Sequence, residues 1–305
     1  MIKEGIYFNL SNEDYHNDPA ISCSGVKNLL DCPTKYWWNS PLNQNKEPLD
    51  TKALRIGKLY HCLLLEPKKF EDEFLVLPKG KLVKSFLKER GLKEDDVIHL
   101  TQIREPDIEG AKEAIQEIKN DKFYNGWFDG GYPEVSIFWK DQETGLMCRC
   151  RFDYLNTKFA IDYKTTEDVT DVKKAVSNYN YNLQSAIYLR GLASLISNDD
   201  FIVEGNDKQK EWFKSFKENL NGNFQFRFLF QEKKAPYISR AITLASDILK
   251  PSIEVFEKAL SIYLDNFNEY GKEKWGSGYN KIEEITLFDM PSYWGIKLEE
   301  QAINY

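Results

Sequence analysis

The sequence predicts an α/β protein with a mixed β-sheet flanked by helices. Two neighbouring segments in the middle of the chain alternate apolar and polar residues and are joined by turn residues, which is the pattern of a β-hairpin. A short apolar run follows them and indicates a third, more buried strand. Segments with apolar residues at helical spacing lie before and after these strands, which gives the order α–β–β–β–α–β.

Before the strands, helical spacing occurs at four places. The helix over 51–65 ends at Glu66-Pro67, because proline disfavours the helical conformation in the residue before it. The N-terminal segment 1–50 is otherwise irregular. The Lys/Glu-rich segment 68–125 is predicted to be a helical insertion. The four helical segments are 24–30, 51–65, about 81–90 and about 107–120.

From Tyr132 onward the pattern becomes that of a sheet with covering helices, and the turn of the hairpin is Asp141-Gln-Glu-Thr-Gly145. The predicted elements are strands over 134–139, 146–155 and 159–161, a helix over 169–195, β-rich segments over 224–230 and 237–244, a helix over 251–270 and an aromatic-rich tail over 271–305.

The composition is that of one large folded domain, which we expect to span residues 1–305. Apolar residues make up 42% of the chain and aromatic residues 14%, which argues against a disordered or fibrous protein. The formal net charge is 41 − 48 = −7. This value excludes a protein that coats nucleic acid by bulk positive charge, but it leaves room for a local basic channel.

The sequence predicts a cytoplasmic protein without a membrane segment. No stretch approaches the roughly 20 apolar residues that span a bilayer, and the N-terminus lacks the apolar core of a signal peptide. The five cysteines have no disulfide-framework spacing, so we expect reduced thiols. Cys148-x-Cys150 is interpreted as a pair of small residues in a sheet rather than a metal site.

The segment from Arg151-Phe-Asp153 to Asp162-Tyr-Lys164 carries the clearest chemical signal. Alternate residues of a strand point the same way, so Asp162 and Lys164 share a face and Tyr163 points to the other. If the second and third strands pair, Asp153 lies beside Asp162. Two carboxylates and a backbone carbonyl suit Mg²⁺ or Mn²⁺, and a neighbouring lysine can stabilise a phosphorane-like transition state. The alternative is a surface ion pair at a strand end.

Two predicted helices add polar residues to this segment. Gly57 lies one turn before His61, where we expect it to let another backbone approach closely, and imidazole can complete a metal shell. On the helix after the third strand, Tyr181, Gln184 and Tyr188 share one face. A buried Gln amide needs hydrogen-bond partners. The alternative for both sets is ordinary core packing.

Together these motifs resemble the RecB-type branch of the PD-(D/E)xK nucleases. They are most similar to the nuclease domain of exodeoxyribonuclease VIII, the RecE family of phages and prophages. The resemblance covers about residues 6–295 and implies a restriction-endonuclease-like core. The motifs, in the family's order, are Gly57-Lys-Leu-Tyr-His61, Glu134-Val-Ser, Arg151-Phe-Asp153, Asp162-Tyr-Lys164-Thr-Thr and Gln184-x-x-x-Tyr188.

This resemblance implies a Mg²⁺-dependent exodeoxyribonuclease, with Mn²⁺ as a substitute. It would hydrolyse linear double-stranded DNA in the 5′→3′ direction and leave 3′ single-stranded overhangs for recombination. It also implies DNA ends and a single-strand annealing (RecT-type) protein as partners, and a homo-oligomeric ring. An endonuclease on the same scaffold and a non-catalytic DNA-binding module are the alternatives. Nicking of closed circular DNA distinguishes the first of these, and DNA retention without hydrolysis the second.

The resemblance also implies roles for individual residues. Lys164 would be the catalytic lysine, Gln184 and Tyr188 would contact DNA or support the site, and Glu134 matches the family's strand glutamate. Phe152 replaces the proline of the family name. The implied metal ligands are His61, Asp153, Asp162 and the backbone carbonyl of Tyr163.

Overall fold

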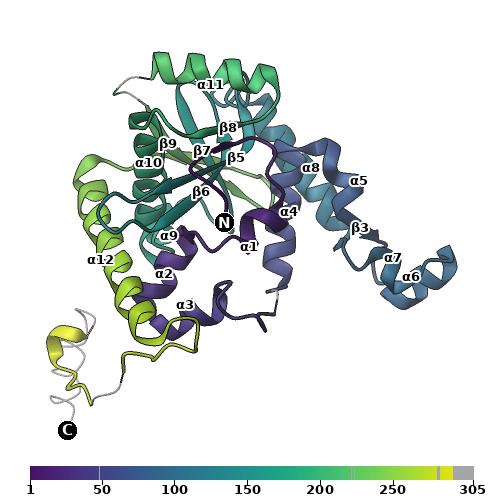
Figure 1. Cartoon of the computed structure of the whole chain (residues 1–305). Helices are drawn as coiled ribbons and strands as arrows, with labels where there is room; N and C mark the ends of the chain where they lie inside the picture. The colour runs from purple at the N-terminus through teal and green to yellow at the C-terminus, as the bar shows by residue number, and fades with distance from the viewer. Residues whose placement is uncertain (48, 221, 223, 280–281, 291–305) are drawn as a thin grey trace, which may run out of the picture.

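The computed structural model describes residues 1–290 except for residues 48, 221, 223, 280 and 281 (Figure 1). Its centre is a mixed β-sheet in which neighbouring strands follow the order β10-β9-β7-β6-β5-β1-β8, with β2 paired to β6. The predicted α/β fold with a mixed sheet is therefore confirmed. The strands of this sheet are β1 (Gly5–Tyr7), β2 (Ile21–Ser22), β5 (Tyr132–Lys140), β6 (Met147–Leu155), β7 (Phe159–Thr166), β8 (Ile202–Glu204), β9 (Gln225–Glu232) and β10 (Ser239–Ile242).

Helices flank the sheet on both sides. They are α1 (Asn12–Asn17), α2 (Cys23–Asp31), α3 (Pro33–Asn39), α4 (Lys52–Leu65), α5 (Phe70–Glu73), α6 (Val83–Arg90), α7 (Glu94–Val97), α8 (Glu105–Asn120), α9 (Val172–Asn178), α10 (Tyr181–Ser197), α11 (Asp207–Asn219) and α12 (Ser246–Tyr270), with short 3₁₀ helices at Pro67–Lys69 and Leu287–Asp289. No helix in the described part of the chain is long and apolar enough to cross a membrane.

Each face of the sheet has its own apolar core. On one face, α2, α10 and α12 pack against the strands, and Ile187 and Phe228 are fully buried there. On the other face, α4 and α8 pack against β7, and Leu59 and Tyr163 are fully buried. The polar groups at the strand ends lie between these two cores. They are therefore held in place by the helices packed on both faces of the sheet.

The strand register brings three acidic residues level with one another. In the antiparallel β5–β6 pair, Pro133 faces Tyr154 and Val135 faces Phe152, so Glu134 and Asp153 stand opposite each other. The antiparallel β6–β7 ladder contains only the pairs Tyr154–Ile161 and Leu155–Ala160. Its next position is therefore Asp153 against Asp162, where the two strands have begun to separate.

The structure corrects the expectation that the N-terminal segment 1–50 is mostly irregular. This segment forms β1, α1, β2, α2 and α3. Strand β1 pairs with β5 and with β8, which lie far along the chain. Strands as short as β1 and β2 carry too few residues to show an alternating pattern, so their pairing is not visible in the local sequence.

The predicted continuous helix over 169–195 is also wrong. It consists of α9 and α10, separated at Tyr179 and Asn180. Asn180 has φ 50° and ψ 50°, a left-handed conformation that ends a right-handed helix and that asparagine tolerates better than most residues. The break starts α10 in a new direction, and Tyr181 becomes its first residue.

Residues 68–125 contain the helices predicted near 81–90 and 107–120, which are α6 and α8. They also contain a parallel pair that was not predicted, β3 (Phe74–Leu77) and β4 (Thr101–Arg104). Together with α6 and α7 this pair encloses a small core of its own and projects from the main sheet (Figure 1).

The aromatic-rich tail is only partly described. Trp275 is buried, and its ring lies 5.2 Å from that of Tyr36 and 5.4 Å from that of Tyr263. Tyr293 and Trp294 lie outside the described residues.

Candidate active site

His61 reaches the separated ends of β6 and β7 from α4. Its Nε2–H donates to the carbonyl of Tyr163 at 2.8 Å, since a carbonyl oxygen can only accept. This bond fixes the tautomer, so Nδ1 carries the lone pair and faces Asp153 Oδ2 at 3.7 Å. Two acceptors that face each other leave room for a cation between them.

Gly57 has a different role from the expected one. A Cβ atom at this position would meet nothing within 4 Å, so no backbone packs closely against Gly57. The expectation of a close approach is wrong. Gly57 leaves open space one helical turn before His61.

Asp153 fills the gap where the β6–β7 ladder ends. Its Oδ2 accepts the backbone N–H of Tyr163 at 2.7 Å, a group that would otherwise be a ladder donor. This hydrogen bond orients the carboxylate along the sheet. One ligand atom from each of His61, Glu134 and Asp153 lies within 4.8 Å of the others.

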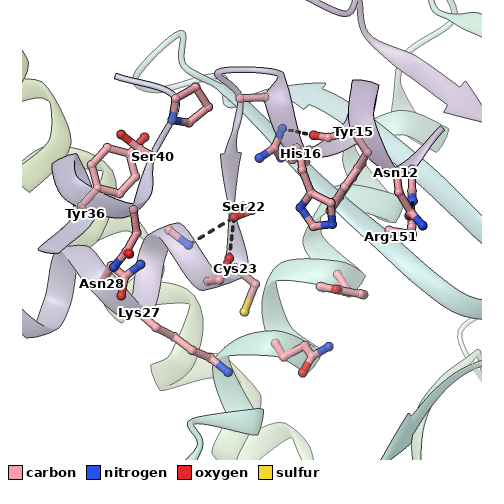
Figure 2. A pocket seen from close by; sticks show the side chains of 18 of the residues that line it. Asn12, Tyr15, His16, Ser22, Cys23, Lys27, Asn28, Tyr36, Ser40 and Arg151 are labelled. Atoms are coloured by element: carbon pink, nitrogen blue, oxygen red, sulfur yellow. Dashed lines mark hydrogen bonds between the residues drawn. The ribbon is translucent and has the colours of Figure 1, made fainter. Parts of the chain in front are cut away.

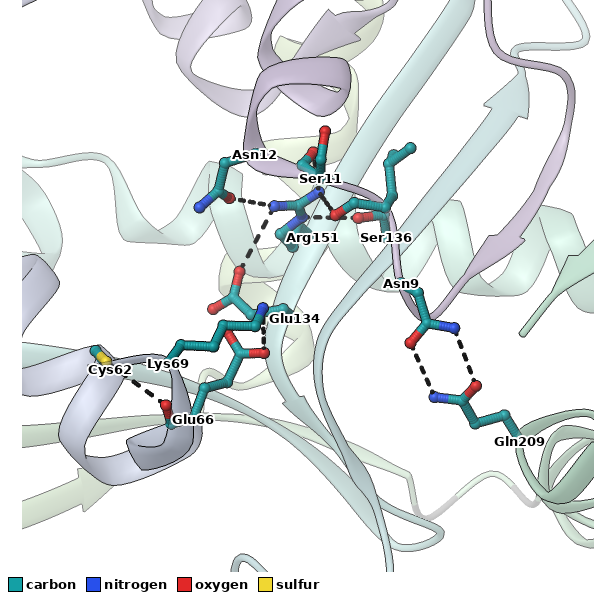
Figure 3. A network of polar contacts seen from close by, with 11 residues as sticks. Asn9, Ser11, Asn12, Cys62, Glu66, Lys69, Glu134, Ser136, Arg151 and Gln209 are labelled. Carbon is teal, nitrogen blue, oxygen red and sulfur yellow. Dashed lines mark hydrogen bonds and ion pairs between the residues drawn. The ribbon is translucent and has the colours of Figure 1, made fainter. Parts of the chain in front are cut away.

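Glu134 has an unusual backbone conformation, with φ 52° near the start of β5. Left-handed conformations of non-glycine residues cost on the order of 1–3 kcal/mol and are concentrated at functional sites. Arg151 lies 3.7 Å from the Glu134 carboxylate. The Arg151 guanidinium also donates to Ser136 Oγ at 2.7 Å and to Asn12 Oδ1 at 2.5 Å, which ties α1 to the sheet beside the glutamate (Figure 3).

Asp162 and Lys164 form an ion pair on β7, with Lys164 Nζ 2.5 Å from Asp162 Oδ1. The other oxygen of Asp162 accepts from the Gln184 amide, which is the partner that a buried glutamine requires. Burial raises the pKa of Asp162 to about 6, although Lys164 opposes this effect. Burial lowers the pKa of Lys164, but the negative charges of Asp162 and Asp153 outweigh burial and hold it above its usual value. The pair is therefore ionised at neutral pH.

The predicted residues thus fall into two adjoining groups. His61 and Asp153 lie together with Glu134, whereas Asp162 is engaged by Lys164 and Gln184, and the Tyr163 carbonyl accepts from His61. Tyr188 packs its ring 5.2 Å from that of Phe152 and lines the cavity described below.

The first group fits a divalent cation. The two carboxylates are suitable donors for Mg²⁺ or Mn²⁺, and the imidazole lone pair adds a donor of the kind that transition metals prefer. Burial, followed by the charge of Asp153, raises the pKa of Glu134 to about 8. The carboxyl groups of Glu134 and Asp153 repel each other when both are ionised. A bound cation would neutralise them and remove this repulsion.

A cavity of about 350 Å³ opens beside these residues, and Glu134, Asp153 and Gln184 are among the residues that line it. Its other walls come from the N-terminal segment 1–50 and from β6. They carry four cationic side chains, those of Lys27, Lys46, Arg149 and Arg151. Figure 2 shows the part of the cavity wall that carries Tyr15, Ser22 and Lys27.

Sequence reasoning did not identify Lys27 and Lys46 as residues of the site. Lys27 lies on the helix predicted over 24–30, in a segment that is otherwise mainly apolar or uncharged. The available sequence signal for its role in the site was that it is the only lysine among the inward-facing residues of that helix. Lys46 lies in an irregular segment that carried no periodic signal.

A mixed sheet with an acid on one strand, Asp153 on the next and Asp162-x-Lys164 on the third is the arrangement of the PD-(D/E)xK nuclease superfamily, to which the fold and the site assign this chain. A family model described as a PDDEXK-like domain of unknown function matches residues 22–204. This match covers more than half of the chain, and the chain belongs to that family.

One solved structure supports the same fold. It is the crystal structure of a protein named "Putative exonuclease" from Eubacterium rectale, with 16% sequence identity and a TM-score of 0.58. The similarity covers 93% of this chain and 98% of the other. At this identity the comparison concerns the fold alone. A comparison with curated proteins finds no match.

Proposed function

We propose that the protein is a Mg²⁺-dependent exonuclease that hydrolyses phosphodiester bonds at the ends of linear double-stranded DNA. The observation that carries the proposal is the cluster of His61, Glu134 and Asp153 next to the Asp162–Lys164 ion pair, where Glu134 and Asp153 line a cavity with cationic walls. A divalent cation in such a site polarises a phosphate oxygen and lowers the pKa of a water molecule.

Other residues of the site would stabilise the transition state or orient the groups that do so. The Lys164 ammonium is fixed by Asp162 and would stabilise the negative charge that a phosphate gains in the transition state. Gln184 holds the second oxygen of Asp162, so the lysine and its partner keep one geometry. His61 and Asp153 are each oriented by Tyr163, through its carbonyl and its N–H.

Attack at DNA ends is supported by the size of the cavity. A volume of about 350 Å³ is at the lower end of the range of small-ligand sites, roughly 300–1,000 Å³. A site of this size suits a nucleotide unit of one strand rather than an intact duplex. An endonuclease on the same scaffold remains the second candidate.

The direction of digestion and the partners are proposed on the resemblance to the RecE family. We propose 5′→3′ digestion that leaves 3′ overhangs for recombination, a homo-oligomeric ring and a single-strand annealing partner in the cytoplasm. We further propose that residues 1–305 form one nuclease domain with an insertion at about 68–125, because α4 and α8 both pack on the nuclease sheet.

Linear duplexes labelled at the 5′ or the 3′ end, incubated with Mg²⁺ or with EDTA, test the activity and its direction together. We expect metal-dependent release of the 5′ label and no cleavage of closed circular DNA. Asp162→Ala removes the activity, whereas Lys158→Ala, an exposed lysine just before the same strand, leaves it unchanged. Ends that stay intact at several Mg²⁺ concentrations would refute the proposal.

A further inference from the structure

The break between α9 and α10 brings an exposed aromatic ring to the edge of the site. Tyr179 lies in this break and is 62% exposed. The next residue, Asn180, has the left-handed conformation described above, and α10 then supplies Gln184. Proteins that bind single-stranded nucleic acid use exposed aromatic rings of this kind to stack on bases.

Tyr179 is the outer end of a row of aromatic rings. Its ring centre is 5.7 Å from that of Tyr181, at an interplanar angle of 33°. The Tyr181 ring in turn stacks on Phe228 at 5.3 Å and 30°, and β9 places Phe228 beside Asp162 of β7. Lys164 Nζ lies 5.2 Å from the centre of the Tyr181 ring. The row therefore starts in the core, passes the ammonium of Lys164 and ends in solvent at Tyr179.

Lys27 connects this row to the cavity. Its ammonium donates to the backbone carbonyl of Tyr179 at 2.6 Å and lies 5.4 Å from the centre of the Tyr181 ring. The same side chain lines the cavity beside Glu134 and Asp153, where Figure 2 shows it extending from α2. Lys27 and Asn28 also line a separate surface groove of about 620 Å³ whose opposite wall is formed by residues 178–181. The groove and the cavity thus share Lys27 and Asn28 on their border.

We propose that Tyr179 is a stacking platform for a nucleobase of the DNA strand whose phosphate lies at Lys164, and that Lys27 contacts a phosphate next to that base. The inference rests on the proposed function, because it takes a DNA strand to be the substrate. An exposed ring followed by an ammonium matches the alternation of bases and phosphates along a single strand. Stacking accepts any base, so the platform positions the strand without selecting its sequence.

The test uses linear DNA with a short single-stranded end that carries 2-aminopurine near the terminus, mixed with the protein in EDTA so that hydrolysis does not occur. We expect the wild-type protein to quench the fluorescence and to bind the DNA. Tyr179→Ala loses the quenching and binds about tenfold more weakly, within the range for removal of one base–aromatic stack. Tyr179→Trp retains both properties, whereas Tyr179→Leu, which is apolar but has no ring, behaves like the alanine variant.

Phe123→Ala is the matched control. Phe123 is 66% exposed and packs beside Trp127, whose ring contacts Phe159 at the opposite end of β7 from Lys164. This variant should bind and quench like the wild type. With Mg²⁺ present, Tyr179→Ala should raise KM about tenfold and change kcat by less than about twofold, which is the result for a group that positions substrate.

Two results would overturn the inference. One is unchanged quenching and affinity for Tyr179→Ala when the wild type binds. The other is a change in the molar mass of the Tyr179→Ala protein in solution with unchanged DNA binding, which would make the ring a protein contact. Quenching by a wild-type protein that fails to cleave with Mg²⁺ would refute the nuclease and leave the platform standing. Absence of any DNA binding would refute both.

Discussion

Glu134→Gln tests whether the cluster of His61, Glu134 and Asp153 is a cation site. In the metal-free protein, burial and the charge of Asp153 raise the pKa of Glu134 from its usual 4.5 to about 8. Below pH 4.5 both the folded and the unfolded chain hold the proton, so the group has no effect on stability. Between pH 4.5 and 8 the unfolded chain ionises while the folded chain does not, and the folded state is progressively disfavoured.

The size of this effect follows from the same pKa. From pH 4.5 to pH 7, at about 1.4 kcal/mol per pH unit, Glu134 lowers the free energy of unfolding of the metal-free protein by about 3 kcal/mol. Glutamine has the same shape and no charge. In EDTA at pH 7, Glu134→Gln should therefore be more stable than the wild type by up to about 3 kcal/mol, and the two should be equally stable near pH 4.5.

Mg²⁺ should reverse the order of stability, so that the wild type becomes more stable than Glu134→Gln. A ligand that binds only the folded state at 1,000 times its Kd stabilises it by about 4.1 kcal/mol, which exceeds the difference of about 3 kcal/mol in EDTA, and this gain requires the complete donor set. Urea unfolding in EDTA and in Mg²⁺ at both pH values measures all four free energies. Glu71→Gln is the control, because this exposed carboxylate on α5 lies outside the cluster. A Glu134→Gln variant that is less stable than the wild type in EDTA, or gains as much from Mg²⁺, would refute the reasoning.

Other substitutions address the proposed catalytic lysine and the packing around the site. Lys164→Ala should lower kcat by about 10²-fold or more in the labelled-duplex assay while retaining the stabilisation by Mg²⁺, whereas Asp162→Ala should lose activity and weaken the Mg²⁺ effect. Gly57→Ala should raise the free energy of unfolding by about 1 kcal/mol in a urea titration, because the new Cβ meets nothing within 4 Å and alanine favours a helix. Gly191→Ala should lower it by about 1–3 kcal/mol, because its Cβ would lie 2.6 Å from the buried Trp139 ring.

The parts of the site that sequence reasoning identified depend on local patterns. The hairpin and the apolar run of β7 have alternating or continuous apolar residues, and their pairing brought Asp153 level with Asp162 as expected. The helical spacing around Gln184 placed its amide on a buried face that needed a partner. The structure supplies that partner in Asp162.

The parts that it did not identify depend on contacts between distant segments. The left-handed conformation of Glu134 has no local sequence signal, since glutamate rarely adopts it and neither Pro133 nor Val135 requires it. Lys27 is similar, because a lysine on a short helix is usually solvated. Its role in the cavity appears only when α2 packs against the sheet and its ammonium reaches Tyr179.

The distribution of charge in the cavity accounts for a nuclease fold on a chain of net charge −7. The acidic residues of the site face one position, and a cation bound there would neutralise their charge. Of the cations in the cavity walls, Arg149 donates to the carbonyls of Tyr15 and Asp18, which joins the C-terminal end of α1 to β6. Its positive charge is therefore fixed in place by the backbone. Since a fixed charge needs no reorganisation when an anion arrives, the N-terminal segment and β6 together supply rigidly held cations to the cavity that the acids also line.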